Sequence, residues 1–106
     1  MQARFIHDGN TIAFVSATDV PKGSVIVLGS LVGITKSDVK AGQRGSLALV
    51  GVFDIAKGDI VVPLGSQVYW DATTKQAVLT AADNVQLGVA VQEATIVESV
   101  VRVRIC

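Results

Sequence analysis

Hydrophobic residues recur at every second position in two stretches near the carboxyl end of the chain. Within residues 85–92 the odd positions are Val or Leu, and the even positions are Gln, Gly or Ala. Residues 101–105 place Val, Val and Ile in one set of alternating positions and two Arg in the other. A period of two is typical of a β-strand with one face on a core and the other toward water or a partner.

Short apolar segments bounded by Gly, Pro, Asp, Asn or Lys fill the rest of the chain, as expected for strands. The further strands that this pattern predicts are residues 11–15, 24–28, 31–35, 46–53, 59–62, 67–70 and 76–80. Helix signals are weak: residues 71–75 have the composition of a hairpin loop, and residues 38–42 allow one turn at most. We therefore expect an all-β fold, a single compact β-barrel or β-sandwich of short antiparallel strands.

The amino-terminal residues have a pattern of their own. Asp8-Gly9-Asn10 predicts a tight hairpin turn between residues 4–6 and residues 11–15. We expect one β domain over residues 1–106, with residues 1–8 as an extended arm.

Composition narrows the class of protein. The chain has 106 residues, which is enough for one domain. Half of the residues are hydrophobic and 5% are aromatic, while Val and Ile occupy 27 positions. Charged residues make up 17%, with nine Lys and Arg balancing nine Asp and Glu, so the chain has neither the charge excess of a disordered segment nor a basic surplus for nucleic acid. Such a shortage of charge favours a surface that is partly covered by other molecules.

The sequence predicts no metal site, no intramolecular disulfide and no membrane segment. Cys106 and His7 are the only residues of their types, so neither an intramolecular disulfide nor a zinc site of several Cys and His ligands is expected. The start of the chain lacks the apolar run of a signal peptide, and no run approaches the ~20 residues of a membrane helix.

Catalytic and cofactor motifs are also scarce. His7 and Asp8 could in principle serve a hydrolase, but neighbouring residues on a strand point to opposite faces. Asp54, Asp59 and Asp71 stand at strand ends, where turn capping accounts for them. The ten glycines form neither a phosphate-binding loop nor a dinucleotide fingerprint. We expect no enzyme activity and no cofactor.

Two features suggest contact surfaces. Arg102 and Arg104 share one face of the last strand, and no aromatic residue alternates with them as a nucleic-acid platform requires. We interpret them as a polar sheet face or an interface. Tyr69 and Trp70 must face opposite ways on their strand, so one is expected in the core and the other at the surface or an interface.

Spaced motifs along nearly the whole chain resemble those of a known family. They include residues 20–29, Val50-Gly51-Val52-Phe53-Asp54, Val68-Tyr69-Trp70-Asp71, Leu87-Gly88-Val89-Ala90 and the terminal Val101–Ile105 segment. This arrangement is similar to that of small proteins encoded beside the major capsid gene in tailed phages, which act as head decoration or cement proteins. Members often carry the label of a RecA/RadA-type recombinase, which conflicts with the absence of a phosphate loop here.

The resemblance implies a non-enzymatic structural protein of the virion, with a fold related to the β-tulip decoration proteins. It would be made in the bacterial cytoplasm and bind the outer capsid surface, with the major capsid protein and other copies of itself as partners. Homotrimers are favoured over dimers, and neither nucleic acid nor membrane is implied as a partner. Our candidate interface residues are Arg4, Phe5, Ile6, Trp70, Arg102 and Arg104. The alternative is a small β-barrel module that binds carbohydrate or another ligand through stacking on Trp70.

Overall fold

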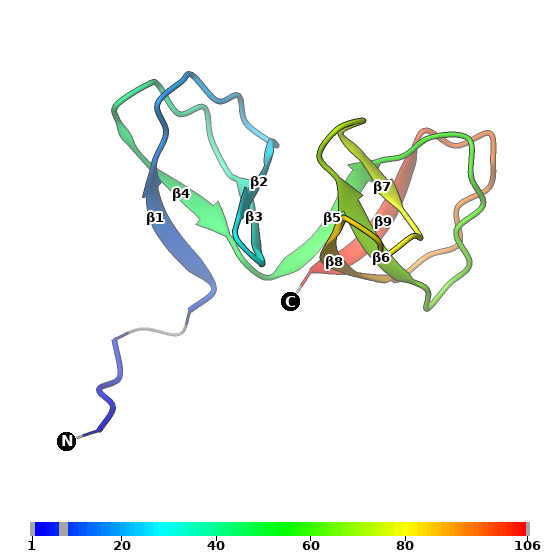
Figure 1. The fold of residues 1–106 in the computed structure, drawn as a ribbon, viewed down its shortest axis with the longest axis horizontal. Coiled ribbons are helices and arrows are strands. Elements are labelled where there is room, and N and C mark those ends of the chain that lie inside the picture. The colour runs from blue at the N-terminus through cyan, green and yellow to red at the C-terminus, as the bar shows by residue number, and fades with distance from the viewer. Residues whose placement is uncertain (1, 7–8, 106) are drawn as a thin grey trace.

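The chain folds into strands connected by turns and loops, as the computed structural model shows for residues 2–6 and 9–105 (Figure 1). This described part contains no helix and nine strands: β1 (Thr11–Val15), β2 (Val25–Leu28), β3 (Leu31–Thr35), β4 (Arg44–Ala48), β5 (Gly51–Ala56), β6 (Gln67–Asp71), β7 (Gln76–Val78), β8 (Val85–Ala90) and β9 (Val100–Ile105). They form two antiparallel sheets, a four-stranded one in the order β1-β4-β3-β2 and a five-stranded one in the order β5-β9-β8-β6-β7. The predicted all-β class is confirmed.

Side chains in the loops of the first sheet fix its connections. The backbone of Val20 bridges that of Val39, which joins the loop before β2 to the loop before β4. Asp19 Oδ1 accepts a hydrogen bond from the Ala41 amide at 2.8 Å, and Asp38 Oδ1 accepts one from the Lys22 amide at 2.7 Å. Each carboxylate therefore satisfies a backbone donor in the opposite loop.

The second sheet contains the alternating stretches of the sequence. In β9, Val101, Val103 and Ile105 are buried while Val100 and the two Arg are exposed, as the period of two predicts. The β6–β7 hairpin closes over Asp71, whose Oδ1 accepts a hydrogen bond from the Thr73 amide at 2.9 Å. That contact confirms the hairpin loop expected at residues 71–75.

Three strand predictions are wrong. Residues 46–53 do not form one strand, because the chain leaves the first sheet after β4 and enters the second at Gly51, whose φ is 137°. Residues 59–62 contribute only an isolated bridge between Val62 and Ala94. Residues 4–6 also form no strand, and His7, Asp8 and Cys106 lie outside the described residues, as does part of the predicted turn.

The core lies mainly within the five-stranded sheet and its loops, and β3 of the first sheet packs against it. Val32 and Ile34 of β3 belong to the same buried cluster as Ile55, Trp70 and Val103 of the second sheet. The architecture is a β-sandwich, so the barrel form of the prediction is wrong. The five-stranded sheet does not close into a barrel, because its outer strands, β5 and β7, share no ladder. One bridge, between Lys57 and Ala77, joins these two edges.

Candidate interaction surfaces

The outer face of the five-stranded sheet is a mixed polar and apolar surface. The strand register places Arg104 directly between Val52 of β5 and Val89 of β8, and Val89 in turn lies opposite Gln67 of β6. Val52 is 54% exposed. One guanidinium flanked by two valines is thus presented to solvent on a rigid support.

The second arginine of β9 is held by a carboxylate on the neighbouring strand. Arg102 Nε donates to Asp54 Oδ1 at 3.0 Å, and Arg102 Nη2 donates to Asp54 Oδ2 at 3.3 Å. This hydrogen bond lowers the pKa of the Asp54 carboxyl and raises that of the guanidinium. Asp54–Arg102 is the one ion pair within residues 2–6 and 9–105, so Arg104 has no carboxylate partner there and Arg102 does.

The amino-terminal arm projects away from the body of the molecule (Figure 1). All of residues 2–6 are exposed, with Phe5 79% and Ile6 69% accessible. Arg4 precedes these two apolar side chains directly. The structure therefore places three of the predicted interface residues on one exposed segment, well separated from β9.

Trp70 has a different environment. Its side chain is 8% exposed and belongs to the core cluster, while Tyr69 faces outward and donates its hydroxyl to Gln67 Oε1 at 3.2 Å. The prediction that the pair divides between core and surface is confirmed.

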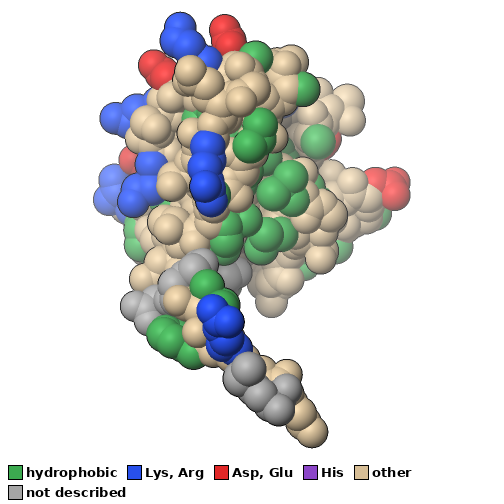
Figure 2. Space-filling model, turned by 90° about the vertical axis from the view of Figure 1, so that its left-hand side faces the viewer, with side chains coloured by type: hydrophobic (Ala, Val, Ile, Leu, Met, Phe, Trp, Pro, Cys, Tyr) green, Lys and Arg blue, Asp and Glu red, His purple; other side chains and the backbone are tan. Residues whose placement is uncertain are grey.

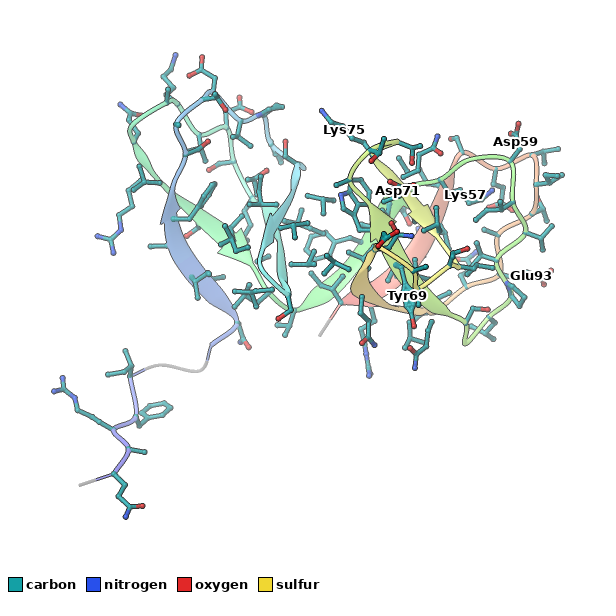
Figure 3. The ribbon with its side chains drawn as sticks, in the orientation of Figure 1. Lys57, Asp59, Tyr69, Asp71, Lys75 and Glu93 are labelled. Carbon is teal, nitrogen blue, oxygen red and sulfur yellow. The ribbon has the colours of Figure 1, made fainter. Side chains whose placement is uncertain are left out.

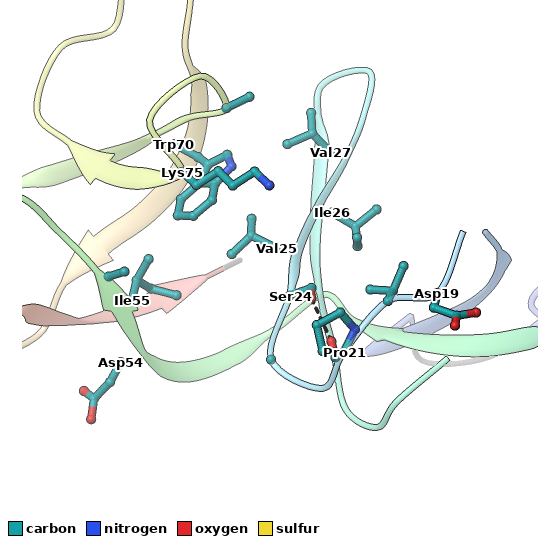
Figure 4. Close-up of a pocket in the computed structure, with 14 residues that line it drawn as sticks. Asp19, Pro21, Ser24, Val25, Ile26, Val27, Asp54, Ile55, Trp70 and Lys75 are labelled. Carbon is teal, nitrogen blue, oxygen red and sulfur yellow. Dashed lines mark hydrogen bonds between the residues drawn. The ribbon is translucent and has the colours of Figure 1, made fainter. Parts of the chain in front are cut away.

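The visible edge of Trp70 lines an open groove between the sheets (Figure 4). This groove has a volume of about 510 Å³ and is lined on the opposite side by β2 residues such as Val25 and Val27. A sugar ring stacks on an exposed aromatic face, and Trp70 offers too little area for that. The stacking platform of the carbohydrate-binding alternative is therefore not formed.

A buried lysine is the residue that sequence reasoning missed. Lys57 is 5% exposed, and its Nζ donates to the carbonyl oxygens of Gly58 at 3.1 Å and Ile60 at 2.8 Å (Figure 3). The ammonium thereby ties down the loop that follows β5. Nothing in the sequence distinguishes this lysine from the exposed ones, because its partners are backbone atoms.

The three aspartates predicted at strand ends are dispersed, and the placement of Asp54 is wrong, because β5 continues past it to Ala56. Asp54 pairs with Arg102, Asp71 caps its hairpin, and Asp59 lies at the far end of the second sheet (Figure 3). Among the described residues, no group of three or more His, Cys, Asp or Glu is placed to hold a metal ion. The same residues include no helix long and apolar enough to span a membrane.

A small β-sandwich with an exposed apolar arm and a Val-Arg-Val sheet face has the features of a protein that works through contact with other proteins. Residues 6–105 match the model of the phage cement protein family, and the chain belongs to that family. It is accordingly a structural protein that associates with the phage capsid. Searches of the curated proteins and of the solved structures gave no significant match.

Proposed function

We propose that this protein binds the outer surface of the assembled phage head and stabilises it by bridging neighbouring subunits of the major capsid protein. The observation that supports this function is the amount of apolar surface left uncovered. Among the described residues, fourteen large hydrophobic side chains are exposed, including Val97 at 88%, Phe5 at 79% and Leu64 at 66%. Such side chains mark interaction sites where they lie together, as Phe5 and Ile6 do on the arm.

A protein that binds the assembled shell but not the separate capsid subunits stabilises the shell by mass action, because binding lowers the free energy of the assembled state alone. Each contact needs only modest affinity, because repeated contacts on a lattice add as avidity. The mechanism requires no cofactor and no catalytic group. The protein would be made in the bacterial cytoplasm and join the shell after the capsid subunits assemble.

Two surfaces are proposed to make these contacts. The outer face of the five-stranded sheet, with Arg102 and Arg104, would meet the capsid, because the guanidinium of the unpaired Arg104 can donate to an acidic group there. The arm, with Arg4, Phe5 and Ile6, would join the protein to a neighbour, and Trp70 would contribute the edge it exposes in the groove. We propose homo-oligomers, with a trimer at threefold positions first and a dimer second.

Co-sedimentation with expanded capsids and with unexpanded shells tests this function. We expect the protein to pellet with expanded capsids, and Arg104→Glu to lower its occupancy at least fivefold. Lys40→Glu is the matched control, because it makes the same charge change at an exposed site in the first sheet's loops. Failure of the wild-type protein to pellet with either form of the shell would refute the proposal.

A further inference from the structure

Two loops form the end of the molecule that lies farthest from the first sheet. Residues 57–66 follow β5 and residues 91–99 follow β8. Val62 and Ala94 hold them side by side through two backbone hydrogen bonds, each 2.9 Å long. Figure 3 shows Asp59 and Glu93, one from each loop, at this end. We name residues 57–66 and 91–99 together the loop pole.

The loop pole buries its bridging residues and exposes their neighbours. Val62 and Ala94 are almost fully buried, at 0% and 1% exposure. The exposed apolar side chains that surround the bridge are Val61 at 50%, Ile96 at 53%, Leu64 at 66% and Val97 at 88%. The bridge fixes the backbone that carries these side chains, so the loop pole offers preformed apolar area to a partner.

Acidic groups accompany this apolar area. Glu93 and Glu98 line a small cavity of about 90 Å³ together with Asp54 and Arg102. Since Arg102 is already paired with Asp54, the cavity retains two carboxylates without a cation among the described residues. Asp59 adds a third acid to the same end. A partner for the loop pole should therefore be both cationic and apolar.

The first sheet of the chain carries a net positive charge and the second sheet a net negative one. Residues 9–50 carry four Lys and Arg against two Asp, and residues 51–105 carry six acids against four Lys and Arg. Figure 2 shows the Lys and Arg side chains gathered over the first-sheet end, with the arm extending below. The arm adds Arg4 to this basic end and follows it with Phe5 and Ile6, which matches the cationic and apolar character that the loop pole requires.

We propose that the loop pole of one copy binds residues 2–6 of a second copy, with Arg4 against Glu93 and Glu98, and Phe5 and Ile6 over Ile96 and Val97. A second copy is the occupant because the arm leaves the body on the side away from its own loop pole (Figure 1). The contact is heterologous, since two different surfaces meet, and such contacts close into rings when the rotation allows. This inference rests on the proposed function, whose oligomer it describes in detail.

Paramagnetic relaxation in a mixed sample tests the contact even when it is weak. One copy carries Gln2→Cys with a nitroxide label and Cys106→Ser, and the second copy is ¹⁵N-labelled wild type. We expect selective broadening of the amide signals of residues 60–64 and 93–97 in the ¹⁵N-labelled copy. Broadening confined to the first sheet, or no selective broadening at millimolar concentration, would overturn the proposal.

Charge reversal identifies the pairing. Adding Arg4→Glu to the spin-labelled copy should reduce the broadening about fivefold, and adding Glu93→Arg to the ¹⁵N copy should restore it. Arg44→Glu, an equal charge change at the exposed first residue of β4, should leave the broadening unchanged. Combined with Glu93→Arg it should show the same loss as Glu93→Arg alone, because Arg4 is intact and then meets a like charge. Capsid co-sedimentation is measured separately, so loss of this contact with retained capsid binding would refute the inference and leave the proposed function standing.

Discussion

Gly88→Ala is expected to disrupt the sheet that supports the candidate interaction face. Gly88 lies opposite Ile105, where β8 pairs with β9. A methyl group added there would lie 2.1 Å from the Arg104 carbonyl oxygen, 2.8 Å from its carbonyl carbon and 3.0 Å from the Ile105 Cα. All three are backbone atoms, so no side-chain rotation can relieve the contact.

The expected loss follows from this geometry. A carbon and a carbonyl oxygen approach no closer than about 3.3 Å, so the two strands must move apart by about 1 Å. Roughly two ladder hydrogen bonds then lengthen beyond their range, at about 1 kcal/mol each. Overpacking of the sheet adds about 1–3 kcal/mol. We therefore expect a loss of about 3–5 kcal/mol from a total stability of about 5–15 kcal/mol.

Urea unfolding followed by the fluorescence of the only tryptophan, Trp70, measures this loss. Gly58→Ala is the matched control, because a methyl group at Gly58 meets the movable end of Gln76, whose Oε1 is 3.0 Å away. That variant should change stability by less than about 1 kcal/mol. Equal protein concentrations keep self-association from entering the comparison. If the two variants unfold within 0.5 kcal/mol of each other (about the precision expected of such a comparison), the backbone argument is refuted.

Three further outcomes are expected. The hydrogen bond from Arg102 lowers the pKa of Asp54 from its ordinary 3.8, so the stabilisation by this pair is present above the unfolded pKa and is lost as pH falls through the folded pKa. In an NMR titration, Asp54 should have a higher midpoint in Arg102→Ala than in the wild type. Equal midpoints would contradict this. Lys57→Met removes two donors from the Gly58 and Ile60 carbonyls and should lower stability by about 1–3 kcal/mol, with faster amide exchange in residues 58–61; a more stable variant would show that the ammonium does not hold the loop. Soluble oligosaccharides should leave Trp70 fluorescence unchanged, whereas saturable quenching would revive the sugar-binding alternative.

The period of two predicts burial in β9 but not throughout β8, where Val89 lies beside Arg104 and Ala90 is buried. The burial of Val101, Val103 and Ile105 follows from alternation, as does the division of Tyr69 and Trp70 between surface and core. The break after β4 does not, because residues 47–53 carry no polar side chain and only the change of sheet at Gly51 interrupts them. A continuous apolar run carries no signal of which sheet each half joins.

The candidate surfaces divide in the same way. The exposure of Arg102 and Arg104 is predictable from their positions in one strand, but the pairing of Arg102 with Asp54 joins residues 48 positions apart. The burial of Lys57 depends on backbone carbonyls, and the loop pole depends on a bridge from Val62, in a segment predicted as a full strand, to Ala94, in a segment with no predicted strand. Such features arise from tertiary contacts, which periodicity does not encode.

The binding free energy of the proposed contact between arm and loop pole indicates when this contact forms. Fully burying side chains such as Phe5 and Ile6 contributes about 1.5–3 kcal/mol each, and an exposed ion pair such as Arg4 with Glu93 contributes at most about 1 kcal/mol. Bringing two free molecules together costs at least about 4 kcal/mol, so the contact alone leaves free copies weakly associated. On a capsid, neighbouring copies are already held close, and the arm then meets a loop pole at an effective concentration of about millimolar. Capsid binding should therefore come before the arm of one copy binds the loop pole of the next. The opposite charges of the arm and the loop pole then determine which end of each copy faces its neighbour.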